Sequence, residues 1–466
     1  MSMQEPFLRE TETGTYEYRI SNVSAIETPS FVPEIKSYED VHAIAPHLDA
    51  LDTSNPLMVP GYQWERIRTM PSMSEHGDDF RSLLSLPHIY YEPPELFRYT
   101  MPGRLVTYAL QGNKTKRGRF NDKVEAGDID GAIEELPQFF RPFVDRQRKS
   151  LLKRYEDGPD PSTETNGKVA EGWGDPRADK GYYDYYQAIV QDAKDIQNVH
   201  VTPPVPVIRK SSGEYNVRRM RGANRAMADV CDAANFGFGN PVYSYYHVYI
   251  DANIVRGNSD HPQRLLDGLQ EDLTTRDYRY GGVVLTITGY EDAWEKNDGQ
   301  ALTEFVEQVG DIATRNRVPL HLPRSGWYGA YLTDVNAHSF GTLMNGSERY
   351  KSKGGGPGDE LYQYGRVPLY EHATEIYVDQ LETYLSNQGG QMHNVPDVPD
   401  QPPSFNPRGG DWQAKFGGPY EFRINFGKPR RLLHAKEARE FRQGRQNGLL
   451  RPAARYFERS DHDHLQ

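Results

Sequence analysis

Hydrophobic and polar positions alternate most regularly in the middle of the chain. Apolar and aromatic runs at residues 246–250, 282–287 and 318–322 predict buried strands. Between them, apolar side chains recur at i, i+3, i+4 and i+7 over residues 262–275 and 300–315, which predicts two amphipathic helices. Because strands and helices alternate at a period of about 35 residues, the pattern indicates βα units that form a parallel sheet.

Shorter apolar runs extend this scheme toward the N-terminus, at residues 30–35, 57–60, 105–110 and 199–208. Seven or eight βα units predict an α/β protein built as a (β/α)8 barrel of the TIM type. The runs before residue 200 are irregular, so a doubly wound open sheet is the alternative.

Composition divides the rest of the chain. We expect an α/β barrel over residues 1–386, interrupted by an acidic, Gly- and Pro-rich loop insertion at 156–181. A Pro- and Gly-rich linker follows at 387–419, and a basic, helical extension at 420–466.

Charge is distributed unevenly along the sequence. The chain has a formal net charge of −12, yet residues 428–459 hold ten Lys or Arg against three acids. This segment therefore carries +7 and the remainder −19. A local basic patch on an acidic protein favours a polyanionic partner, such as DNA or tRNA. The alternative is an Arg-rich helix that packs on an acidic face of the same chain.

Other basic clusters lie at residues 114–119, 141–154 and 209–225, with Tyr and Phe interleaved as base-stacking sites require. No helix-turn-helix or zinc-finger motif accompanies them. The residues that we expect to contact nucleic acid are Arg117, Arg119, Arg219, Arg221, Arg430, Arg431, Arg442 and Arg445.

Reactive groups of parallel α/β proteins lie at the carboxyl ends of the strands. Asp251 and Glu291 follow the first two regular strands, and we expect them to act as the catalytic carboxylates. The expected substrate-binding residues at the same edge are Asn253, His321, Arg324 and Asn345. Each has a structural alternative: an acid after a strand often caps a helix, and a histidine between apolar neighbours often lies in the core.

The sequence offers little for a metal or a cofactor, and we expect neither. Cys231 is the single cysteine, which excludes a disulfide within the chain and a multi-cysteine zinc site. There is no apolar run of membrane-spanning length and no signal-peptide pattern at the N-terminus, so a cytoplasmic location is expected.

Two segments resemble the tRNA-guanine transglycosylase superfamily. The segment IETPSFVP at residues 26–33 is similar to its opening barrel strand, and DVNAHSFGTLMNGSERY at 334–350 to its last strand and the segment that follows. Together they cover about 25 residues. The resemblance implies a (β/α)8 barrel that exchanges guanine for a 7-deazaguanine in tRNA or DNA, with one Asp as nucleophile on the ribose C1′ and a second as general acid and base.

The chain departs from that family at three points. Gly341 stands at the nucleophile position, the Asp-Ser-Gly segment is missing, and the zinc cysteines are absent. Three hypotheses follow: a transglycosylase-type barrel that binds and modifies nucleic acid, a nucleic-acid-binding or scaffold subunit without catalysis, and a glycosidase-like barrel that uses Asp251 and Glu291.

Overall fold

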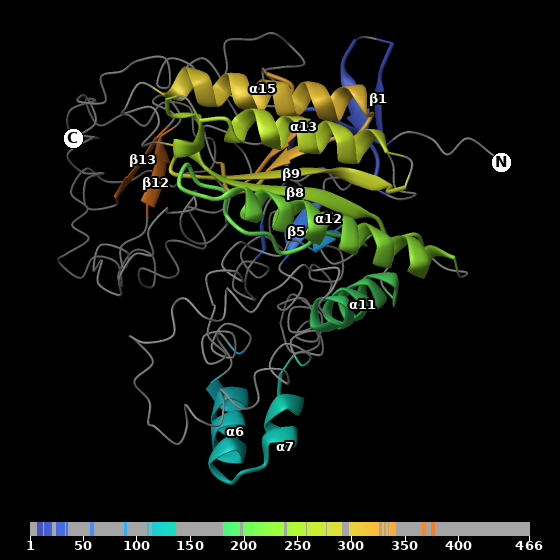
Figure 1. Ribbon diagram of the computed structural model, residues 1–466, viewed down its shortest axis with the longest axis vertical. Coiled ribbons are helices and arrows are strands. Elements are labelled where there is room, and N and C mark those ends of the chain that lie inside the picture. Colours follow the sequence, from blue (N-terminus) through green and yellow to red (C-terminus); the bar gives the residue numbers. More distant parts are fainter. Residues whose placement is uncertain are drawn as a thin grey trace, which may run out of the picture.

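The computed structural model describes a large part of the chain (Figure 1). The described residues are 7–12, 14–20, 25–32, 34–35, 56–59, 88–90, 110, 114–136, 141, 180–195, 199–236, 240–257, 259–275, 277–290, 298–325, 329, 332–333, 335–341, 366–369 and 374–377. The expected linker at 387–419 and basic extension at 420–466 lie outside them, as does the loop insertion up to residue 179.

A curled sheet of eight strands forms the centre of the described residues. Its order is β4-β11-β10-β9-β8-β7-β6-β5, and every neighbouring pair runs parallel. The strands are β4 (Ser30–Phe31), β5 (Leu57–Val59), β6 (His88–Tyr90), β7 (Val199–Val201), β8 (Ser244–Asp251), β9 (Tyr280–Thr288), β10 (Leu320–Leu322) and β11 (Ser339–Phe340). From β5 to β11 the spatial order follows the sequence.

One backbone bridge joins the first and last strands of that order. Glu34, three residues after β4, pairs with Met58 in β5 in the parallel sense. The amide of Ile35 donates a 2.8 Å hydrogen bond to the Met58 carbonyl.

Helices follow the strands along the chain and cover the outer face of the sheet (Figure 1). They are α11 (Lys180–Asp195), α12 (Glu214–Asn235), the short 3-10 helix η4 (Ala252–Val255), α13 (His261–Thr274) and α15 (Gly299–Arg315). The two helices predicted in the middle of the chain are confirmed as α13 and α15, and the strands beside them as β8, β9 and β10. The α/β class is therefore confirmed.

Three smaller units accompany the sheet. A three-stranded antiparallel unit comprises β1 (Leu8–Glu10), β2 (Tyr16–Tyr18) and β3 (Ile26–Glu27). Helices α6 (Lys114–Glu125) and α7 (Ile129–Glu134) form a hairpin beyond α11, and β12 (Arg366–Leu369) pairs with β13 (Thr374–Tyr377) (Figure 1).

The N-terminal unit lies at the amino ends of the sheet strands. The Leu8 amide donates to the carbonyl of Arg317, just before β10, and the hydroxyls of Tyr18 and Ser30 are 2.6 Å apart. Side chains of this unit form one apolar cluster with Met58, Ile89, Tyr245 and Val284 of the sheet. The unit therefore covers this end of the inner face of the sheet.

Strand β8 is buried on both faces, as expected for a parallel sheet covered by helices. Tyr246 points outward, where its hydroxyl donates to Asp272 of α13. Tyr245 points inward and lies opposite Gly282 of β9. A Cβ atom at Gly282 would lie 2.9 Å from the Tyr245 ring, and one at Gly281 only 2.5 Å. The two glycines of β9 therefore make the space that the tyrosine ring fills.

Three fully buried histidines line the sheet beside that ring. His200 accepts the Tyr243 amide through Nδ1, and His247 lies between the Pro203 carbonyl and the Thr286 hydroxyl. His321 stacks on Tyr245 with ring centroids 5.4 Å apart. Burial lowers the pKa of His200 and of His321 to about 3, and that of His247 to about 4.

These histidines make the fold sensitive to acid. Below pH 6.5 the unfolded chain takes up protons that the folded histidines accept only near pH 3–4, so the free energy of unfolding falls over that window and is unaffected above it. Each histidine lowers the free energy of unfolding by up to about 1.4 kcal/mol for every pH unit in that window. The three together lower it by up to about 4 kcal/mol per pH unit.

Urea unfolding measured at pH 7.5, 6.5 and 5.5 tests this expectation. A His321→Gln variant removes one titrating group, so its loss of stability between pH 6.5 and 5.5 should be about 1 kcal/mol smaller than that of the parent. An identical pH dependence in both proteins would contradict the assignment.

Candidate functional site

The carboxyl ends of the sheet strands bring several polar side chains to one edge. Asp251 is the last residue of β8 and pairs in register with Thr288, the last residue of β9. The loop from β7 to α12 reaches this edge at Ile208, whose backbone pairs with Ile250 and whose carbonyl accepts the Asp251 amide at 2.9 Å. We call this end of the sheet the carboxyl edge.

Asp251 is nearly buried, with 7% of the residue exposed. Its Oδ1 atom accepts the amide of Asn253 at 3.1 Å, so Asp251 caps the helix η4. Its Oδ2 atom lies 3.9 Å from Nε of Arg209. The structural alternative, a helix cap, is thus confirmed for Asp251, and its catalytic role stays a prediction.

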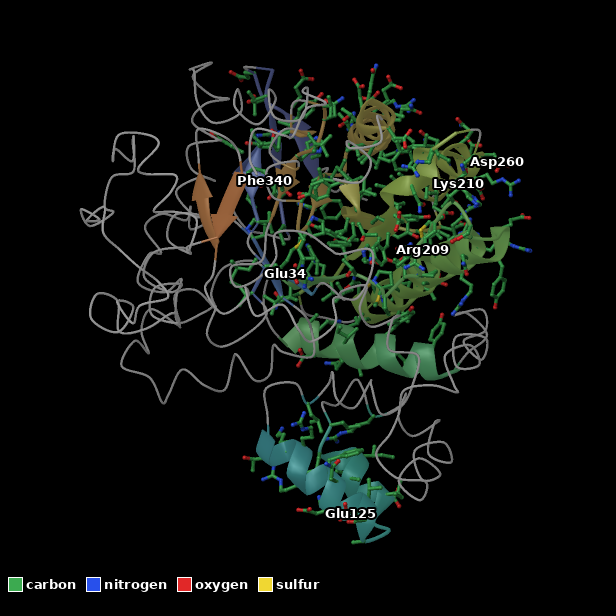
Figure 2. The ribbon with its side chains drawn as sticks, turned by 90° about the vertical axis from the view of Figure 1, so that its left-hand side faces the viewer. Glu34, Glu125, Arg209, Lys210, Asp260 and Phe340 are labelled. Carbon is green, nitrogen blue, oxygen red and sulfur yellow. The ribbon has the colours of Figure 1, made fainter. Side chains whose placement is uncertain are left out.

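Three cations lie around the helix η4, namely Arg209, Lys210 and Arg256, which we call the basic rim. Arg209 and Lys210 follow β7, and Arg256 ends η4. Figure 2 shows Arg209 and Lys210 on one side of the molecule, together with Asp260. Through Arg209, the rim places positive charge beside a nearly buried acid.

Hydrogen bonds tie the rim to η4. Asn253 Oδ1, predicted to bind substrate, accepts the Lys210 amide at 3.1 Å. A Cβ atom at Gly257 would lie 3.3 Å from Lys210 Nζ, so the lysine side chain runs along the end of η4. Arg256 Nε donates to Asp298 at 2.7 Å.

A buried ion pair holds another part of the carboxyl edge. Arg324, which follows β10, donates from Nε and from one terminal nitrogen to the two carboxylate oxygens of Glu34, at 2.8 and 2.6 Å. The side chains are 5% and 1% exposed. Arg324 adopts φ +46°, a backbone conformation uncommon for a residue other than glycine. Its guanidinium, predicted to bind substrate, is thus engaged by a carboxylate of its own chain.

Gly341 packs against β4 at this seam. A Cβ atom on it would lie 2.2 Å from the Val32 carbonyl oxygen, far inside van der Waals contact. The backbone at residue 341 therefore excludes every side chain, and an aspartate there would require β4 and β11 to separate.

His321, also predicted to bind substrate, lies inside the sheet in β10. Its Nδ1 bonds the Ser339 hydroxyl and its ring packs between Tyr18 and Tyr245. These contacts correspond to the alternative of a core histidine. Its Nε2 and the Tyr245 hydroxyl make no hydrogen bond within the described residues.

The arginines predicted to bind nucleic acid fall into two groups. On α12, Arg219 is buried and lies over the Tyr215 ring, and Arg221 donates to the buried carboxylate of Asp272, which raises the pKa of Arg221. On α6, Arg117 and Arg119 are exposed, and Arg119 pairs with Glu135. Their role in binding stays a prediction, although Arg219 and Arg221 are held by contacts within the protein.

Several predicted residues lie outside the described residues: Glu291, Asn345, Arg430, Arg431, Arg442 and Arg445. Sequence reasoning placed Arg209 and Lys210 in a basic cluster without singling them out, and it missed Arg256 and Glu34. The position after a strand is a usable signal for Arg209 and Lys210. No signal in the sequence marked Glu34, because its partner Arg324 is 290 residues away along the chain.

The described residues contain no group of three or more His, Cys, Asp or Glu side chains that could hold a metal ion. Within this part of the chain, no helix combines the length and apolar character needed to cross a membrane.

No family model matches the chain, and no curated protein matches it in sequence.

The Glu34–Arg324 pair should make a large contribution to stability. Glu34→Gln leaves a buried guanidinium without its counter-charge, and we expect the free energy of unfolding to fall by about 3 kcal/mol. Glu17→Gln is the matched control, because Glu17 pairs with Arg9 on the surface, where loss of the pair should cost less than about 1 kcal/mol. Equal effects of the two substitutions in urea unfolding would contradict a structural role for the buried pair.

Proposed function

We propose that this chain is a nucleic-acid-binding barrel protein that contacts phosphates through the basic rim. The observation that carries the proposal is the grouping of Arg209, Lys210 and Arg256 around η4, with Arg209 3.9 Å from the nearly buried carboxylate of Asp251. A cytoplasmic location would give such a protein access to tRNA and, in a cell without a nucleus, to DNA.

The proposed architecture is a closed (β/α)8 barrel. Eight parallel strands whose order follows the sequence from β5 to β11, with β4 beside β11, support it. The backbone bridge between Glu34 and Met58 supports closure between β4 and β5. A doubly wound sheet would reverse its strand order at a switch point, and this order contains no such reversal.

The charge of the rim suits a phosphate backbone. The side chains of Arg209 and Arg256 are 45% and 38% exposed, so both present a cation at the surface, although Arg256 is also hydrogen-bonded to Asp298. In a protein of net charge −12, an anion gains nothing from the overall field and needs a local cluster of cations. Phosphate contacts made by such a cluster release counterions, which drives binding at low salt.

Asp251 is the described carboxylate best placed for chemistry on the bound nucleotide. In base exchange, which the resemblance in sequence implies, a carboxylate oxygen bonds to the ribose C1′ while the C1′–N bond breaks. The departing base takes the electron pair and a proton from solvent. An incoming base then loses its ring N–H proton to solvent while that nitrogen displaces the carboxylate from C1′. Asp251 lies beside the rim that would hold the adjoining phosphate, whereas the Glu34 carboxylate is occupied by Arg324.

Binding without catalysis is the second candidate. It is favoured by Gly341, because no side chain fits at the position where the resembling family carries its nucleophile. The glycosidase-like hypothesis depends on Glu291, for which the described residues give no geometry.

Salt dependence tests the binding proposal. We expect the affinity of the full-length protein for duplex DNA, single strands or tRNA to fall steeply as salt rises. In an Arg209→Gln/Lys210→Gln variant, the slope of log K against log[salt] should decrease by about 0.7–0.9 for each lost phosphate contact.

Arg9→Gln is the matched control for that experiment. Arg9 is a surface cation of the N-terminal unit, at the opposite end of the strands, and its loss should leave the slope unchanged. Absence of binding, or equal slopes for all three proteins, would contradict the proposal.

Incorporation of labelled guanine into tRNA and DNA separates the two candidate functions. If Asp251 is the nucleophile, Asp251→Asn should abolish incorporation while nucleic acid remains bound. Exchange by the variant at the parental rate would remove Asp251 from the mechanism. No exchange by the parent protein, combined with salt-dependent binding, would favour the non-catalytic candidate.

A further inference from the structure

Arg209 faces one anion of its own chain and, at the proposed site, a second one from the ligand. Its Nε lies 3.9 Å from Asp251 Oδ2, at the outer limit of an ion pair. A charge-assisted hydrogen bond between such groups is about 2.7–2.9 Å long. The interaction with Asp251 is therefore electrostatic attraction without a hydrogen bond between these two atoms.

The two partners differ in their freedom to move. The Arg209 side chain is 45% exposed, whereas that of Asp251 is 10% exposed and is held by the Asn253 amide. An arginine with this exposure can turn toward a ligand in solvent. The aspartate cannot follow it.

The backbone beneath Arg209 is fixed on both sides. The Arg209 amide donates to the Ser212 hydroxyl at 2.9 Å, and the next amide, that of Lys210, donates to Asn253 Oδ1 at 3.1 Å. Any movement of the Arg209 cation therefore takes place in the side chain.

Arg256 and Asp298 give a contrast at the same edge. Their atoms are 2.7 Å apart, which is a direct hydrogen bond, and both side chains are less exposed than that of Arg209. Arg256 and Asp298 are therefore directly hydrogen-bonded, whereas Arg209 and Asp251 attract each other across a longer distance.

From these contacts we propose that a nucleic-acid phosphate competes with Asp251 for Arg209, so that phosphate binding draws the cation away from the Asp251 carboxylate. The inference rests on the proposed function and specifies how phosphate binding at the rim changes the electrostatic environment of the Asp251 carboxylate. Arg209 acts as a positioning residue: it keeps Asp251 partly neutralised in the free protein and leaves it as the more nucleophilic carboxylate when substrate is bound.

Competition has a reciprocal consequence. If phosphate binding weakens the attraction between Arg209 and Asp251, then removing the Asp251 charge must strengthen phosphate binding through Arg209 by the same factor. A residue that only caps η4 would not have this effect.

A double-mutant cycle measures that coupling. The full-length parent protein, Asp251→Asn, Arg209→Gln and the double variant are titrated with a labelled single-stranded oligonucleotide of about 16 nucleotides at one fixed salt concentration. Asparagine keeps the oxygen that accepts the Asn253 amide, so the cap of η4 is preserved. We expect Asp251→Asn to tighten binding about threefold to tenfold in the parent background and not at all in the Arg209→Gln background.

Asp311→Asn is the matched control, because it removes one surface carboxylate near the end of α15, and it should change the affinity less than about twofold. Equal tightening by Asp251→Asn in both backgrounds, or no tightening in either, would overturn the competition while leaving the proposed binding intact. Absence of binding by the parent protein would overturn both.

Discussion

Glu34 joins the short strands at one side of the sheet through both its backbone and its side chain. Its backbone bridges Met58 in β5, and its carboxylate accepts two hydrogen bonds from Arg324 after β10. Between β10 and β4 lies β11, which contributes two residues to the sheet, as does β4 itself. Because such short strands supply few ladder hydrogen bonds, a buried ion pair across them fixes the geometry of the carboxyl edge.

The ion pair also constrains what this edge can do. Its charges are paired with each other, so neither is offered to a ligand in the way that an exposed arginine is. At the same seam, Gly341 excludes a side chain through its contact with the Val32 carbonyl. The part of the edge formed by β10, β11 and β4 is thus structural, and the chemically available groups lie at β7 and β8.

The long central elements could be predicted from the sequence because their periodicity extends over whole helices and strands. Strands β8 and β9 have eight and nine residues and helix α15 has 17, which is enough to establish a period. The short strands β4, β5 and β7, of two or three residues, gave irregular signals for the same reason.

The candidate site was only partly predictable. Asp251 could be found because it directly follows a regular strand. The Glu34–Arg324 pair could not, because hydrophobic periodicity says nothing about which charges meet across 290 residues. Likewise, the need for glycine at positions 281 and 282 could not be predicted, because it arises from the Tyr245 ring that packs against them in the fold.

The proposed function requires that nucleic acid binds at the basic rim. Photo-crosslinking of bound single-stranded DNA, followed by identification of the modified peptides, tests that location directly. We expect crosslinks in the segments that carry the rim, residues 209–213 and 252–257. Crosslinks confined to the N-terminal unit at residues 8–27 or to α6 and α7 would place binding elsewhere and contradict the central claim.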